Sequence, residues 1–150
     1  MIYLVKDDLI EVIQEKLLDD SLQLDDNILD GLEIKAIAFS ASYISGRYKV
    51  NEIFGGTWWT EDGTQPTAAV KRSPILVQAI AMIVIYRAVR RNAARKVPDD
   101  YTDIYKEALK ILENIQKGSQ TLDGLPEVTD DDGSTAKLMY GNTTKDEYFL

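Results

Sequence analysis

The chain has 150 residues, 45% of them hydrophobic, and a net charge of −8, so it is long enough for one domain with a core. It contains no cysteine and no histidine, which excludes disulfides, cysteine nucleophiles and every Ser-His or Cys-His catalytic arrangement. The acidic balance argues against a dedicated nucleic-acid binder. We therefore expect no enzymatic activity, no metal site and no cofactor.

The first 48 residues predict two helices separated by a polar break at 18–27. Asp7 or Asp8 begins the first helix, because either side chain can accept a hydrogen bond from the first turn. The second helix is capped by one of the polar residues 25–27 and ends near Gly46, a plausible left-handed stop, with Arg47 complementing its negative end. The apolar faces of the two helices are Leu9, Val12, Ile13 and Leu17, and then Leu32, Ala36, Phe39 and Tyr43.

Residues 49–72 have a different character, with three glycines, one proline and the adjacent Trp58 and Trp59. We expect a long loop here, with a short hairpin around the tryptophans. Tryptophan is a common interface anchor, so this pair is a candidate contact for a partner. The alternative is that the loop folds back over its own bundle.

The stretch AIAMIVIYRAVRRNAARK, from Ala79 to Lys96, belongs to a third helix. Ser73 as cap and Pro74 at the first helical position favour its start, and Pro98 stops it. The apolar run at 79–86 is too short for a membrane span, which needs about 20 residues. It predicts instead a central helix that is buried on most sides, and no association with a membrane.

Seven basic residues and no acid lie between Lys71 and Lys96. One interpretation is a positive strip for phosphate or for an acidic protein surface. The alternative is pairing with acids of the chain itself or of another subunit, which we favour because residues 1–33 carry ten acids against two lysines. Four arginines of this basic cluster are interface candidates: Arg87, Arg90, Arg91 and Arg95.

Asp99 or Asp100 caps a fourth helix, which ends at Gly118. Its buried face comprises Tyr101, Ile104, Ala108, Ile111, Leu112 and Ile115. Beyond it the composition shifts to turn residues, acids and short apolar clusters. The sequence thus predicts an all-α bundle of about four helices at 1–122, with a loop insertion at about 49–72 and an extended C-terminal arm at 123–150.

Four stretches together resemble the Mu-type phage head–tail connector (adaptor) proteins, which are small helical proteins of tailed phages and prophages. The order and spacing of the four, rather than any single motif, carry the resemblance over most of residues 1–122. The chain departs from the family pattern in its Trp-bearing loop, where the family has a short proline-rich link, and in its long tail. The stretches are YLVKDDL from Tyr3, SASYISGRY from Ser40, AIAMIVIYRAVRRNA from Ala79 and YTDIYKEALKILENIQKGSQTL from Tyr101.

The resemblance implies a virion protein of the head–tail junction, present in the host cytoplasm during assembly. It implies a dodecameric ring beneath the portal protein, joined to a downstream tail or stopper protein, with DNA passing through the channel without sequence-specific binding. Such a ring needs two different patches on each subunit, which the basic and acidic stretches provide. The Arg-Tyr pair that closes the second stretch, Arg47 and Tyr48, joins the interface candidates.

The C-terminal arm contains two apolar clusters, at 136–140 and 147–150. Each could add an edge strand to a partner's sheet, and we expect the arm to be mobile in the free protein and ordered in the particle. Its candidate contacts are Tyr140, Tyr148, Phe149 and Leu150. Two other classes of function stay open, namely a nucleic-acid-binding regulator acting through the basic stripe Arg87–Lys96 and a hydrolase using paired carboxylates.

Overall fold

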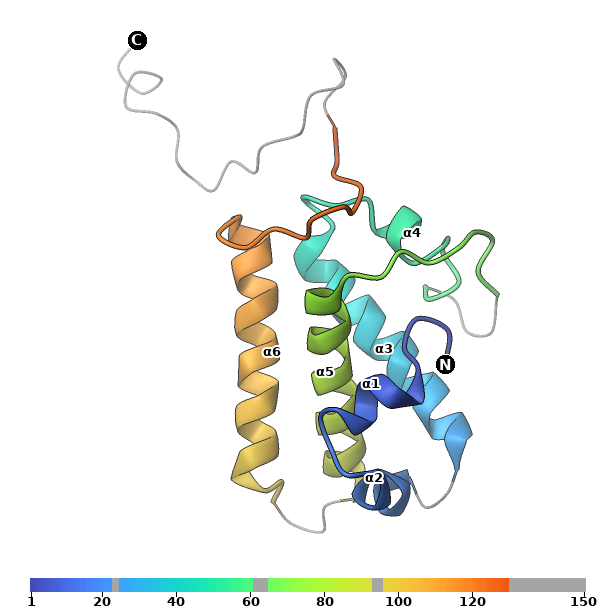
Figure 1. The fold of residues 1–150 in the computed structure, drawn as a ribbon, viewed down its shortest axis with the longest axis vertical. Helices are drawn as coiled ribbons and strands as arrows, with labels where there is room; N and C mark the ends of the chain where they lie inside the picture. The colour runs from blue at the N-terminus through green and yellow to red at the C-terminus, as the bar shows by residue number, and fades with distance from the viewer. Residues whose placement is uncertain (23–24, 61–64, 93–95, 130–150) are drawn as a thin grey trace.

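A computed structural model describes residues 1–22, 25–60, 65–92 and 96–129, and these residues form six helices (Figure 1). The all-helical class is confirmed, but the expected number of about four helices is not. The first expected helix is divided in two, and the loop contains a short helix of its own. The elements are α1 (Lys6–Ile10), α2 (Glu15–Leu22), α3 (Asp26–Ile44), α4 (Val50–Ile53), α5 (Pro74–Asn92) and α6 (Asp99–Lys117).

Helix α5 is the centre of the bundle, as its apolar run predicts. It contacts α1, α2, α3 and α6, and Figure 1 shows it between α3 and α6. Nearly all of the run from 79 to 86 is buried, because neighbouring helices cover it on several sides. The buried residues are Leu76, Ala79, Ile80, Ala81, Met82, Ile83, Val84, Ile85 and Ala88.

The expected first helix breaks between Ile10 and Glu15. It begins at Lys6 with Val5 as its N-cap, so the expected start at Asp7 or Asp8 was wrong. Asp8 lies in the first turn, where its carboxylate accepts a hydrogen bond from the Val5 N–H at 2.7 Å. The break shifts the helical register, so Leu18 rather than Leu17 enters the core. Leu17 is 45% exposed, and its placement on the buried face was wrong.

The buried face of α3 is rotated from the one expected. Of the four residues predicted for it, only Ala36 is fully buried, and Phe39 is half-buried. The reason is that the true stripe contains two polar residues, Glu33 and Ser40, which hydrophobic periodicity does not count. Asp25 caps α3 as expected, but Gly46 does not have a positive φ. The full stripe is Leu29, Glu33, Ala36, Ile37, Ser40, Ala41 and Ile44.

The segment between α3 and α5 folds back onto the bundle. It contains α4 and, among its described residues, no hairpin. The Gly55 carbonyl accepts hydrogen bonds from Thr67 N and Ala68 N at 2.8 and 3.1 Å. Gly55 has φ +74, and a Cβ there would lie 2.3 Å from the Ala68 oxygen, so only glycine fits this close crossing.

Helix α6 begins after Pro98, which is its N-cap and makes no side-chain cap bond. The expected cap by Asp99 or Asp100 was wrong, because both already lie in the first turn, where their charges complement the helix dipole. The helix ends at Gly118 with φ +86, as predicted. Its fully buried residues, all from the expected face, are Ala108, Leu112 and Ile115.

Residues 118–129 return over the end of the bundle. Leu122 and Leu125 are buried, and the chain pairs with the α3–α4 connection through Lys49 N to Pro126 O and Val128 N to Arg47 O, both 2.9 Å. Packing therefore continues past the expected arm boundary at 122/123. Residues 130–150, with Tyr140, Tyr148, Phe149 and Leu150, lie outside the described residues, as does Arg95.

Candidate functional site

Arg47 and Tyr48, two interface candidates, are engaged within the chain. The Arg47 guanidinium donates to the Ile115 carbonyl at 2.9 Å and so caps the last turn of α6, rather than its own helix. The Tyr48 hydroxyl accepts from the Leu122 N–H at 2.8 Å, and Tyr48 is only 1% exposed. The pair thus fastens α3 to the end of α6, and Tyr48 has no free surface for a partner.

The two tryptophans also lie against their own bundle. Trp58 is 2% exposed, and its indole N–H donates to the Phe54 carbonyl. Trp59 is half-buried, donates to the Gly56 carbonyl at 2.9 Å and packs edge-on against Phe54 with ring centroids 5.8 Å apart. The alternative in which the loop folds back holds for Trp58, and only Trp59 keeps surface that a partner could contact.

The arginines of α5 differ in their surroundings. Arg87 is half-buried and lies over the Phe39 ring at 5.4 Å, and desolvation lowers the pKa of its guanidinium. Arg90 and Arg91 are exposed in the last turn. Among the described residues, none of the three arginines forms an ion pair.

The basic cluster forms ion pairs with acids of the same chain at the two ends of the cluster. Arg72 pairs with Asp8 at 2.6 Å, which joins the segment before α5 to α1. Lys96 pairs with Asp99 at 3.1 Å, but both side chains are about four-fifths exposed. Arg87, Arg90 and Arg91 have no such partner in the described part of the chain, so the two exposed ones, Arg90 and Arg91 (the basic end), remain available to another molecule.

A buried carboxylate that the sequence analysis did not single out holds the N-terminus. Glu33 is 1% exposed, and its carboxylate accepts N–H groups from Ile2, Tyr3 and Leu4 at 2.8, 2.8 and 2.6 Å. Desolvation raises the pKa of Glu33, while these hydrogen bonds act in the opposite direction. Residues 2–4, the N-terminal strap, are thereby fixed along α3.

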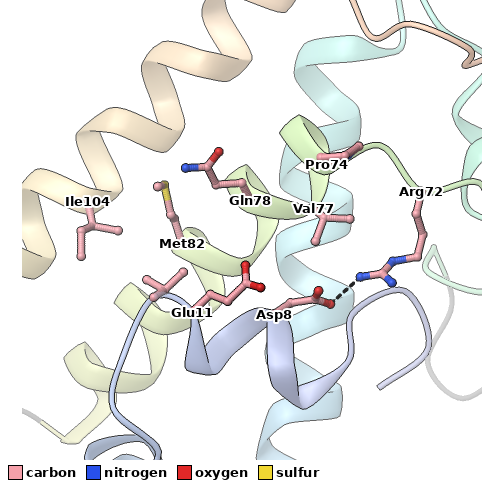
Figure 2. Close-up of a pocket in the computed structure, with 9 residues that line it drawn as sticks. Asp8, Glu11, Arg72, Pro74, Val77, Gln78, Met82 and Ile104 are labelled. Atoms are coloured by element: carbon pink, nitrogen blue, oxygen red, sulfur yellow. Dashed lines mark hydrogen bonds and ion pairs between the residues drawn. The ribbon is translucent and has the colours of Figure 1, made fainter.

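Helices α1, α5 and α6 enclose a groove of about 730 Å³ (Figure 2). Its polar edge consists of the Asp8–Arg72 ion pair, Glu11 and Gln78. Glu11 and Gln78 are exposed, and in Figure 2 the Glu11 carboxylate points from the end of α1 toward α5. The apolar lining comprises Val12, Val77, Met82 and Ile104. The arrangement is that of an apolar trough with an acidic edge (the acidic groove).

Sequence reasoning missed the acidic groove because its residues come from three helices. Asp8 in α1 and Glu11, the C-cap of α1, are spaced by three, so their side chains lie on the same side, which was the one available signal. Glu33 had a signal of the same kind, since it is spaced by four from Leu29 and Ile37. Neither spacing distinguishes a buried or groove-lining acid from a solvated one.

No metal-binding group of three or more His, Cys, Asp or Glu side chains occurs in the described ranges. Within those ranges, every helix is too short or too polar to cross a lipid bilayer. Comparison with protein-family models, with curated proteins and with solved structures finds no match in any of the three.

Proposed function

We propose that the protein is a head–tail connector subunit, which forms a ring beneath a phage portal protein and joins it to a downstream tail or stopper protein around the exiting DNA. The proposal rests on the resemblance of four stretches to that family, since no comparison identifies a relative. The ring of twelve copies and the location in the virion follow from the same resemblance.

One observation supports the proposal beyond the resemblance in sequence: two of the four stretches contact each other. The Arg47 guanidinium, from the second stretch, donates to the Ile115 carbonyl in the fourth. A Cβ on Gly118 would lie 3.1 Å from a guanidinium nitrogen of Arg47, so the arginine packs closely against the glycine that ends α6. Residues that were quoted separately thus form one structural unit, which supports a shared fold.

The distribution of charge supports assembly rather than catalysis. The acidic groove and the basic end of α5 are two different patches, as a head-to-tail ring requires. The carboxylate-hydrolase alternative has little support, because Asp8 already pairs with Arg72. The nucleic-acid alternative retains one favourable observation, which is that Arg90 and Arg91 are exposed. A gel shift with duplex DNA at low and moderate salt tests it, and salt-sensitive binding would favour it.

Deletion of the gene from its phage or prophage tests the connector function. We expect lysates with DNA-filled heads and complete tails that are not joined, and joining restored by the gene supplied in trans. Normal virions from the deletion would contradict the proposal. A mixture of unjoined heads and tails is specific, because loss of a capsid or tail protein removes one of the two structures.

A further inference from the structure

We propose that the acidic groove of one copy receives the basic end of α5 from a second copy. This contact rests on the proposed ring, and it names the two surfaces that the ring would use. The groove offers the Glu11 carboxylate and the Gln78 amide beside an apolar trough, while the basic end offers the guanidinium groups of Arg90 and Arg91. An arginine suits such a place, because its aliphatic stem packs on apolar surface while its guanidinium binds a carboxylate.

One copy cannot make this contact with itself. The two surfaces share the rigid helix α5, on which Met82 and Arg90 are eight residues or about 12 Å apart along the axis. At about 100° per residue, Gln78 lies about 120° around α5 from Arg90 and about 140° from Arg91. Val77 lies about 140° from Arg90 but only about 40° from Arg91. The separation along the axis and the different direction of Gln78 keep the acidic groove and the basic end apart within one molecule.

This geometry defines a heterologous interface. Two different and separate patches on each copy join copies head to tail, which closes into a ring or extends into a filament. Within the described residues, Glu11 forms no ion pair, whereas Asp8 is occupied by Arg72. Glu11 is thus the acid that a second copy would engage, and Asp8 and Arg72 keep α1 in place beside it.

Disulfide trapping tests the contact directly, because the chain has no cysteine of its own. Copies with Gln78→Cys are mixed with copies carrying Arg91→Cys, which leaves Glu11 and Arg90 charged. The matched control mixes Gln78→Cys with Lys110→Cys, an exposed position on α6. We expect the 78–91 disulfide to form about fivefold faster than the 78–110 disulfide, and the advantage to fall at high salt. Equal rates for the two pairs would overturn the proposal.

Charge exchange gives a second readout. Glu11→Arg copies and Arg90→Glu,Arg91→Glu copies should each self-associate less than the unmodified chain in sedimentation. Mixing them should restore association, because each groove then meets an end of opposite charge. No restoration in the mixture, while each variant keeps the helical circular dichroism of the unmodified chain, would overturn the proposal. The 78–91 disulfide can show no rate advantage while the gene deletion still leaves unjoined heads and tails. In that case the proposed interface is wrong and the connector function stands.

Discussion

Replacement of Glu33 is the sharpest test of how this fold is held together. The Glu33 side chain is 1% exposed and its carboxylate is the acceptor for three backbone N–H groups of the N-terminal strap. Glu33→Ala removes that acceptor, so the strap either keeps its place with unpaired N–H groups or detaches. Detachment exposes Tyr3 and Leu4, each of which is 1% exposed in the folded protein.

Unpaired N–H groups and detachment of the strap lower the free energy of unfolding by similar amounts. Loss of an acceptor by buried N–H groups costs about 1–3 kcal/mol each, and exposing a large buried side chain costs about 1.5–3 kcal/mol. We therefore expect Glu33→Ala to lower the free energy of unfolding by about 3–5 kcal/mol. Glu33→Gln should cost less, about 1–3 kcal/mol, because one oxygen still accepts while the NH₂ group faces an N–H donor.

Urea denaturation followed by circular dichroism measures the loss, with Glu113→Ala as a matched control at an exposed position on α6. Amide hydrogen exchange adds a local readout, since the amides of residues 2–4 should lose protection in Glu33→Ala before those of α5 do. A Glu33→Ala variant within about 0.5 kcal/mol of the unmodified protein would refute the reasoning.

The titration of Glu33 gives this test a pH dependence. Its pKa is raised above the ordinary value of 4.5, so the folded state binds the proton more tightly than the unfolded state. Stability from this group is thus lost as the pH rises from the ordinary pKa through the raised one. The difference in free energy of unfolding between the unmodified chain and Glu33→Gln should shrink across that pH range. A difference that grows there would contradict the raised pKa of Glu33.

Three further predictions concern other parts of the fold. Trp58→Ala should destabilise the protein by about 3–5 kcal/mol, measured by urea denaturation, because the indole is buried and hydrogen-bonded to Phe54. Gly118→Ala and Gly124→Ala should each cost about 1–2 kcal/mol in the same assay because both have positive φ, and Gly118→Ala should cost the more of the two because a Cβ there would lie 3.1 Å from the Arg47 guanidinium. Burial raises the pKa of Tyr3 from 10.0 to about 12, so the stability from its protonated form falls as the pH rises through 10 to 12, and Tyr3→Phe should remove that part of the alkaline loss.

The sequence predicts those parts of the fold that depend on local signals. Ser73-Pro74 and the apolar run from Ala79 mark the start and the burial of α5, and Gly118 marks the end of α6. These features were confirmed because capping chemistry and hydrophobic periodicity act within a few turns.

What the sequence did not predict depends on contacts between distant residues. Glu33 is buried because it meets residues about thirty positions earlier, and Arg47 caps α6 through the carbonyl of Ile115, which lies 68 positions later. The acidic groove exists only once three helices have packed. Trp58 was ambiguous for the same reason, since a polar loop conceals that its tryptophan fills the core.

The most direct test of the central claim is electron microscopy of this protein mixed with the portal protein encoded in the same genome. The proposed function predicts an added ring of density beneath the portal, sharing its symmetry axis and open along the channel. Portal particles without added density, while this protein sediments as an unbound monomer from the same mixture, would contradict the claim.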